Sequence, residues 1–147
     1  MTREEATEKI LQAKQGRGLT FDDIARAVGR HKVWTTAALL GQASMSKEEA
    51  ERAVACLGLE PVYAEILQTI PMKGSLGATG PVDPLIYRFH EVTQVYGTTM
   101  KALIHEMFGD GIMSAIDFTL DIERVPDPHG DRVKVTYNGK FLPYKKW

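Results

Sequence analysis

The sequence predicts an α+β protein in which a bundle of short helices precedes a smaller unit of helix and antiparallel strands. Three observations support this prediction. Helix start and stop signals recur through the first 70 residues, residues 71–81 hold three glycines and two prolines, and the last third alternates apolar and polar residues around turns. A chain of 147 residues suffices for two small domains. We place the boundary in the Gly/Pro-rich segment and predict domains at 1–75 and 76–147.

The first domain reads as short helices separated by glycines. Thr20 stands three residues before Asp23, and Ser46 three before Glu49, the spacing of a capping box at a helix start. Gly29, Gly41 and Gly58 stand where these helices should end. We predict helices over 3–14, 21–28, 31–40, 47–56 and 60–67, packed as an orthogonal bundle of the repressor-like helix-turn-helix type.

The second domain opens with Asp83-Pro84, an N-cap followed by a first-turn proline. We predict a helix to about Tyr96, a break at Gly97 and a second helix to Phe108. Alternation then predicts strands over 115–122 and 132–137. Asn138-Gly139 predicts a hairpin turn into a third strand at 140–142.

This second half is short for a self-supporting domain, because the fewer than 70 residues that follow the Gly/Pro-rich segment bury an apolar core only marginally. Its predicted strands nevertheless present an apolar face that needs covering. We therefore predict that it intertwines with the same half of another chain, with a shared core against the first half as the alternative.

Composition narrows the function classes. The chain carries 18 basic and 19 acidic residues, distributed almost evenly between its halves, so nothing in the charge balance favours nucleic acid as the main partner. Cys56 is the single cysteine, which fits a reducing compartment. No apolar run approaches the ~20 residues of a membrane helix, and residues 2–8 lack a signal-peptide core. We expect a soluble cytoplasmic protein that contacts no membrane.

A helix-turn-helix pattern over residues 19–41 raises the alternative of a DNA-binding regulator. The stretch that would enter the major groove, residues 32–40, is mostly apolar beyond Lys32 and the preceding His31. Base reading requires exposed polar or basic side chains at that place. We interpret the bundle as a scaffold or assembly element rather than a DNA reader.

The most informative stretches lie in the second half. They read DPLIYRFHE at 83–91, QVYGTT at 94–99, KALIHE at 101–106, GDGIMSAI at 109–116 and NGKFLP at 138–143. Together they closely resemble the catalytic domain of cyanases, a family in which a repressor-like bundle precedes that domain. The resemblance implies catalytic roles for Arg88, Glu91 and Ser114. His90 is a departure, because another aromatic residue is as readily expected there.

The physical chemistry of these residues agrees with the implied roles. Arg88 and Glu91 are spaced i, i+3 and so share a helix face. A guanidinium stays charged and grips carboxylate-like anions with two hydrogen bonds. Ser114 follows a glycine turn, where its hydroxyl and nearby N–H groups can bind an oxygen. Glu91 can orient Arg88 or a reactant, or relay a proton.

The resemblance also implies the reaction and the partners. Bicarbonate, as co-substrate, attacks cyanate, the dianion loses carbon dioxide to leave carbamate, and carbamate yields ammonia and a second carbon dioxide. No metal or organic cofactor is implied. Cyanases are decamers, pentamers of dimers with shared active sites, and we expect the same homo-oligomer here.

Two alternatives to catalysis stay open from the residues alone. Arg88 and Glu91 can be an ordinary surface ion pair worth under ~1 kcal/mol, and Ser114 a turn residue. The chain can then be a transcription regulator built on its first half, or an assembly protein that lacks activity.

Overall fold

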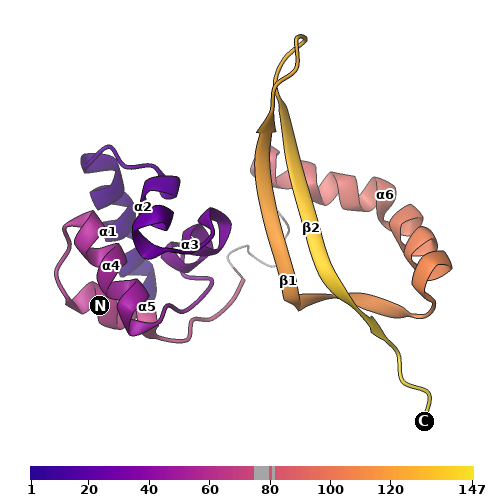
Figure 1. The fold of residues 1–147 in the computed structure, drawn as a ribbon, viewed down its shortest axis with the longest axis horizontal. Coiled ribbons are helices and arrows are strands. Elements are labelled where there is room, and N and C mark those ends of the chain that lie inside the picture. The colour runs from indigo at the N-terminus through magenta and orange to yellow at the C-terminus, as the bar shows by residue number, and fades with distance from the viewer. Residues whose placement is uncertain (75–79, 81) are drawn as a thin grey trace. The chain divides into compact units, whose positions relative to one another are not determined.

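A computed structural model describes residues 1–74, 80 and 82–147. The chain divides into two compact units, Met1–Ser75 and Leu76–Trp147 (Figure 1). The predicted Gly/Pro-rich segment, 71–81, falls partly on residues 75–79 and 81, which lie outside the described residues. No helix among the described residues is long and apolar enough to cross a membrane.

The first unit contains five helices, which confirms the predicted bundle. They are α1 (Arg3–Gly16), α2 (Phe21–Val28), α3 (Lys32–Leu39), α4 (Lys47–Leu57) and α5 (Val62–Gln68). The capping boxes form as predicted: the hydroxyls of Thr20 and Ser46 accept from the N–H groups of Asp23 and Glu49. Gly29 ends α2 with a φ of 80°, in the left-handed region that favours glycine.

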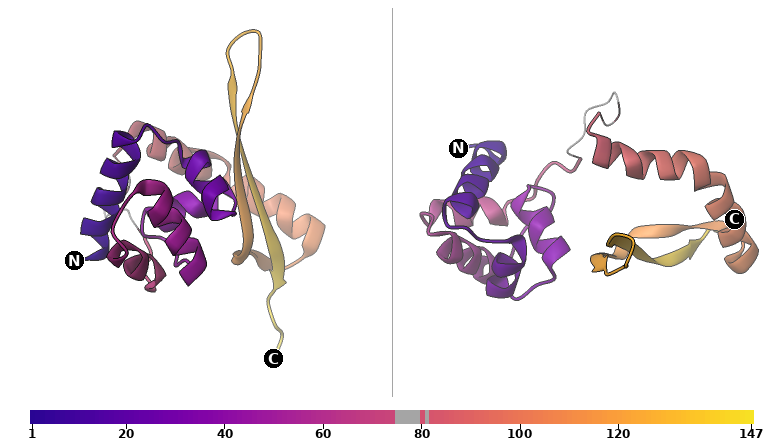
Figure 2. Two further views of the ribbon diagram at one scale, coloured as in Figure 1. Left: turned by 60° about the vertical axis from the view of Figure 1, so that its left-hand side comes forward. Right: turned by 90° about the horizontal axis from the view of Figure 1, so that it is seen from above.

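Figure 2 shows these helices packed together. They enclose one apolar core. Its fully buried large side chains come from all five helices and include Ile10, Ile24, Leu39, Leu57 and Leu67. α2 shows the principle clearly, since Ile24 and Val28 stand four residues apart on its inner face and both are completely buried. Burying such side chains stabilises the unit by roughly 1.5–3 kcal/mol each.

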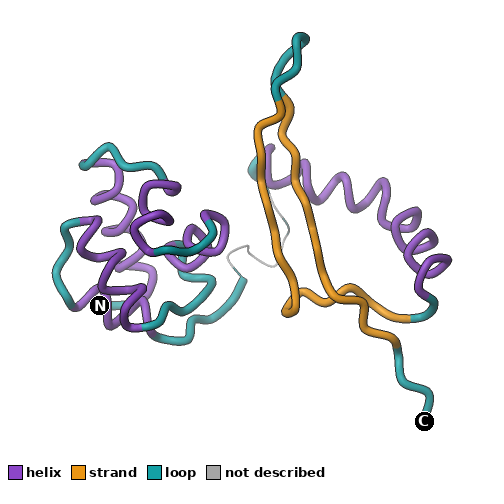
Figure 3. The backbone as a smooth tube through the Cα atoms, viewed as in Figure 1, coloured by secondary structure: helices purple, strands orange, loops and turns teal. Residues whose placement is uncertain are grey.

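The second unit consists of one helix, α6 (Pro84–Phe108), and a two-stranded antiparallel sheet, β1 (Gly111–Val125) and β2 (Arg132–Pro143) (Figure 3). The α+β class is thereby confirmed. The predicted break at Gly97 is wrong, because α6 runs through it without interruption. Gly97 does not take a positive φ, and a glycine inside a helix costs only about 1 kcal/mol relative to alanine.

The sheet contains two strands where we predicted about three. The turn between β1 and β2 lies at 126–131, as expected. Asn138-Gly139 is not a turn: both residues lie inside β2, paired with Thr119 and Phe118. The reason is steric, since a Cβ on Gly139 would lie 2.4 Å from the carbonyl oxygen of Ser114 on β1. Glycine is needed here for close strand approach rather than for a turn.

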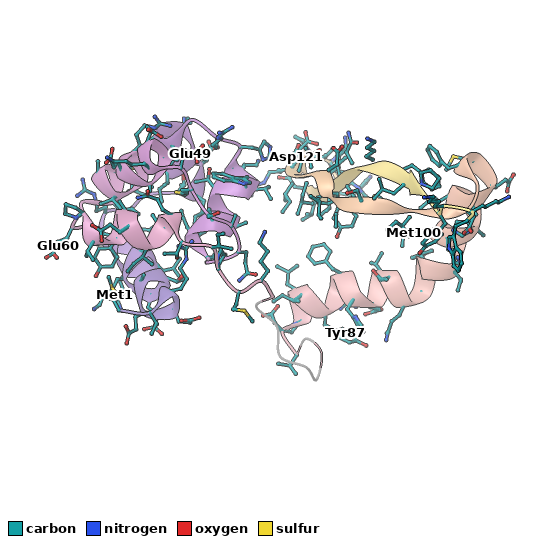
Figure 4. All side chains as sticks on the ribbon, turned by 90° about the horizontal axis from the view of Figure 1, so that it is seen from below. Met1, Glu49, Glu60, Tyr87, Met100 and Asp121 are labelled. Atoms are coloured by element: carbon teal, nitrogen blue, oxygen red, sulfur yellow. The ribbon has the colours of Figure 1, made fainter. Side chains whose placement is uncertain are left out.

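Helix α6 buries none of its 25 residues within the chain. At 100° per residue, seven of its large apolar side chains gather on one face. This face is formed by Leu85, Phe89, Val92, Tyr96, Met100, Leu103 and Met107, which are 43–69% exposed. We call it the α6 apolar face. Figure 4 shows the side chains that project from α6, with Tyr87 and Met100 labelled.

Candidate active site

The first predicted site pair lies in the opening turns of α6. The carboxylate of Asp83 caps the helix by accepting from the N–H groups of Leu85 and Ile86, at 2.9 and 3.0 Å. This cap fixes the residue at which the helix begins. It therefore also sets the direction in which the side chains of the following turn project. Arg88 and Glu91 follow on that turn, and their side chains form a hydrogen-bonded ion pair between Nη1 and Oε2.

The pair is open to solvent, with side chains 63% and 41% exposed for Arg88 and Glu91. One guanidinium nitrogen is engaged by the carboxylate, so the remaining N–H donors of Arg88 are available to an anion. Glu91 holds the long arginine side chain in place at the cost of one donor. The geometry suits a guanidinium that binds an anion while its partner orients it.

Ser114 occupies an irregular part of the sheet. Met113 pairs with Phe141 and Phe118 pairs with Gly139, so residues 114–117 of β1 stand opposite Lys140 alone. This bulge turns the chain so that Ser114 is 5% exposed whereas Ile116 is 98% exposed. The hydroxyl oxygen of Ser114 accepts from the N–H groups of Ile116 at 3.0 Å and Asp117 at 2.9 Å.

These two hydrogen bonds determine what the serine can do. A hydroxyl has two acceptor lone pairs and one O–H donor. With both lone pairs of Ser114 accepting from backbone N–H groups, the hydroxyl is left with its proton to offer. The arrangement therefore suits donation to an anionic oxygen and polarises the O–H bond in that direction.

The end of α6 is tied to this sheet by short contacts around the glycine turn. Gly109 ends the helix with a φ of 89°. The N–H of Tyr144 donates to the carbonyl of Asp110 at 3.1 Å. The rings of Phe108 and Phe141 stack with their centroids 4.9 Å apart. The turn is thereby anchored three residues before Ser114.

The structure brings Arg88 and Glu91 together, as the helix spacing predicted. Among the described residues of one chain, no hydrogen bond or ion pair links Ser114 to either of them. No group of three or more His, Cys, Asp or Glu side chains in the described part could hold a metal ion.

Sequence reasoning missed the backbone elements that support Ser114. Residues 115–122 read as a regular alternating strand, yet 114–117 form the bulge whose N–H groups hold the serine oxygen. Gly139 read as a hairpin turn, yet it makes room for the Ser114 carbonyl. A signal was present in the conflict between a long alternating strand and a glycine directly opposite it, since glycine within a strand often marks a bulge.

The fold defines an α+β protein in which a repressor-like helical bundle is followed by a helix-and-hairpin unit that carries the Arg88–Glu91 pair and Ser114. Two family models match the chain, and together they span most of it. "Cyanate hydratase, N-terminal" matches residues 3–71, and "Cyanate lyase C-terminal domain" matches residues 78–146.

Individual relatives agree with the family models. A cyanate hydratase from Acaryochloris marina is 57% identical over 143 residues, covering 97% of both chains, and one from Synechocystis sp. is 59% identical, covering 96% of this chain and 94% of the relative. The crystal structure of cyanase from T. urticae matches with a TM-score of 0.84 at 41% identity, over 94% of this chain and 96% of that one. The chain belongs to the cyanate hydratase family and is an enzyme of the lyase class.

Proposed function

We propose that this enzyme decomposes cyanate with bicarbonate to ammonia and carbon dioxide. The observation that carries the proposal is the similarity to proteins named cyanate hydratase over at least 96% of this chain. It is supported by an arginine–glutamate pair and a serine donor that suit two small anions. Bicarbonate is a co-substrate, and the reaction requires no metal or organic cofactor.

Arg88 is proposed to bind the reacting anions. Cyanate and bicarbonate each carry a negative charge, and their encounter in one pocket is repulsive unless cationic groups offset it. The guanidinium stays protonated and can grip a carboxylate-like group with two parallel hydrogen bonds. Holding both reactants in attack geometry can supply ~7–11 kcal/mol of the barrier.

Ser114 is proposed to donate its hydroxyl hydrogen to an oxygen of the same dianion. Its two lone pairs already accept from Ile116 and Asp117, so no reorganisation is needed when charge develops on the substrate. Glu91 is proposed to orient Arg88, the one contact that its carboxylate makes with a site residue in the described chain.

The proposed sequence of steps balances in atoms and charge. An oxygen of bicarbonate bonds to the cyanate carbon and the bicarbonate proton passes to nitrogen, giving a dianion. Its C–O bond breaks to release carbon dioxide, and one proton from solvent converts the remainder to carbamate. A second proton on nitrogen precedes breakage of the carbamate C–N bond, which gives ammonia and carbon dioxide.

We further propose that the site is completed between subunits of a homo-oligomer, a decamer built as a pentamer of dimers. One arginine is few for a dianion, and Arg88 and Ser114 have no polar link within the described part of one chain. The exposed α6 apolar face supports assembly, because a row of exposed large apolar side chains marks an interaction surface.

The test follows ammonia release from cyanate by purified protein, with and without added bicarbonate. We expect release only with bicarbonate. Arg88→Ala should lower kcat/KM by ~10²-fold or more, by analogy with the loss of one charge-stabilising donor. The matched control is Arg26→Ala, which removes another arginine in an exposed i, i+3 pair, with Asp23, in the first unit.

The control should turn over cyanate as fast as the wild type. Ammonia release that is independent of bicarbonate would remove the co-substrate from the proposal. Equal losses in both variants would show that Arg88 acts through general charge rather than at the site. No turnover by an assembled oligomer would refute the enzymatic activity on cyanate.

A further inference from the structure

The support of Ser114 depends on how closely the two strands approach at the bulge. Gly139 on β2 lies beside the first residue of the bulge on β1. A Cβ on Gly139 would lie 2.4 Å from the backbone oxygen of Ser114, and 2.5 Å and 3.2 Å from Cγ and Sδ of Met113. Contacts under 3.0 Å are essentially never seen for a real Cβ. A side chain here would force the strands apart.

The need for glycine at this position is spatial and not conformational. Gly139 does not have a positive φ, so its backbone is one that any residue can adopt. The contact with Met113 involves side-chain atoms, which can change rotamer or be removed by substitution. The carbonyl of Ser114 cannot, because it belongs to the backbone of the bulge itself.

We propose that Gly139 is a positioning residue for Ser114, a role that rests on the proposed function of that serine. To restore 3.0 Å, the Ser114 carbonyl would have to recede by about 0.6 Å from an alanine at 139. That displacement moves the residue whose hydroxyl accepts from Ile116 and Asp117. Misplacement of a reacting group by about 1 Å can cost ~10² in rate.

The strand register makes the effect local. Beyond the bulge, the pairs from Phe118–Gly139 to Val125–Arg132 follow one another without a shift. The three atoms nearest to an alanine Cβ at 139 all belong to Ser114 and Met113 of β1. The strain therefore enters the sheet where the serine is held, while the hairpin arm keeps its pairing.

The experiment compares wild type, Gly139→Ala, Met113→Ala/Gly139→Ala and Ser114→Ala/Gly139→Ala with Ser114→Ala, as assembled proteins of verified size. In Gly139→Ala we expect kcat/KM on cyanate to fall ~10-fold or more. The double variant with Met113→Ala should not recover, because the clash with the backbone oxygen remains. In the Ser114→Ala background, Gly139→Ala should cost little more, since both changes act on one group.

Hydrogen exchange gives a readout that does not depend on turnover. The amides of Ile116 and Asp117 should exchange about an order of magnitude faster in Gly139→Ala, with 118–125 unchanged. A strain-matched control is Gly111→Ala, whose Cβ would lie 2.3 Å from the Leu142 carbonyl and whose three nearest atoms belong to residues 141–143 and not to Ser114. In the double variant Ser114→Ala/Gly111→Ala, the fold losses of activity of the two single variants should multiply, because the two changes act independently.

The outcomes separate the two proposals. A wild type inactive on cyanate refutes the proposed function, while exchange at 116 and 117 still tests the positioning. With an active wild type, Gly139→Ala within twofold of it overturns the inference. Recovery of activity by Met113→Ala, or a full multiplicative loss in the Ser114→Ala background, would also overturn it. So would loss of the fold in both Gly139→Ala and Gly111→Ala, because Gly139 would then be required for strand pairing in general.

Discussion

The two units differ in where they place their apolar side chains. Every buried hydrophobic side chain in the described part of the chain belongs to the helical bundle, from Ala6 to Leu67. The second unit buries Ser114 while leaving the α6 apolar face open. The bundle buries its core side chains within a single chain. The other unit carries the proposed chemistry on elements that need a partner, so its site and its assembly are coupled.

The comparison extends to two ion pairs of the same kind. Asp23 and Arg26 in the bundle, and Arg88 and Glu91 in α6, are both i, i+3 pairs with the arginine more than 60% exposed. Spacing and exposure do not distinguish the two pairs, although Asp23 also accepts from Thr20 and Arg26 also pairs with Asp22. What differs is the setting, since α6 also carries the open apolar face. A pair of this kind becomes a site through what assembles around it.

The largest contrast should appear when the units are separated. Residues 1–74 should fold alone as a monomer and unfold cooperatively on heating, because they hold the complete buried core. Residues 82–147 should show no cooperative transition as a monomer and should self-associate. Circular dichroism measures the unfolding transition of each fragment, and analytical ultracentrifugation measures its association state. A stable monomer of the second fragment would contradict the argument.

A charge on the α6 apolar face should break assembly. Leu103→Glu places a carboxylate where we propose that another chain packs, and burying an unpaired charge costs several kcal/mol. Sedimentation should show smaller species, and cyanate turnover should fall with the loss of the assembled state. Gln94→Glu, on the opposite side of the same helix, is the control that should sediment like the wild type.

A cavity in the bundle should affect stability more than activity. Leu39 is completely buried, and Leu39→Ala should cost about 2–5 kcal/mol in the free energy of unfolding of the bundle. Chemical denaturation measures this loss. Turnover per folded protein at 25 °C should change little, because no proposed site residue lies in the core. A matching fall in kcat would show that the bundle shapes the site.

The smallest effect concerns pH and the cap of α4. Hydrogen bonding of Glu49 to the Ser46 backbone, followed by the Arg30 guanidinium, lowers the pKa of the Glu49 carboxyl. The unfolded chain therefore binds a proton first as pH falls. The stability from Glu49 is complete above its ordinary pKa of about 4.3 and is lost as pH falls toward the lowered value.

Thermal unfolding of the 1–74 fragment between pH 6 and 3 measures this dependence. Glu49→Gln should flatten it and cost up to about 1 kcal/mol at neutral pH, a typical value for a helix cap. Glu8→Gln, at an exposed position of α1, is the control for the loss of one negative charge. Profiles that shift equally in both variants would assign the effect to net charge.

Helix caps and periodicity were predictable because their causes are local. Thr20, Ser46 and Asp83 satisfy N–H groups within three residues, and each begins a helix where the sequence indicated. Gly97 and Gly139 were misinterpreted for the opposite reason. A glycine can be needed for its backbone conformational freedom or for the room that its missing side chain leaves to a neighbouring segment. Only the structure around it shows which of the two applies.

By itself the sequence determined the α+β order of elements, the bundle helices and the i, i+3 placement of Arg88 and Glu91, because these depend on contacts within a few residues. Tertiary structure decided the pairing of Gly139 inside β2 and the bulge whose N–H groups hold the Ser114 hydroxyl oxygen. Those features depend on two strands meeting from residues more than 20 positions apart, and close packing between distant segments leaves no mark in local periodicity.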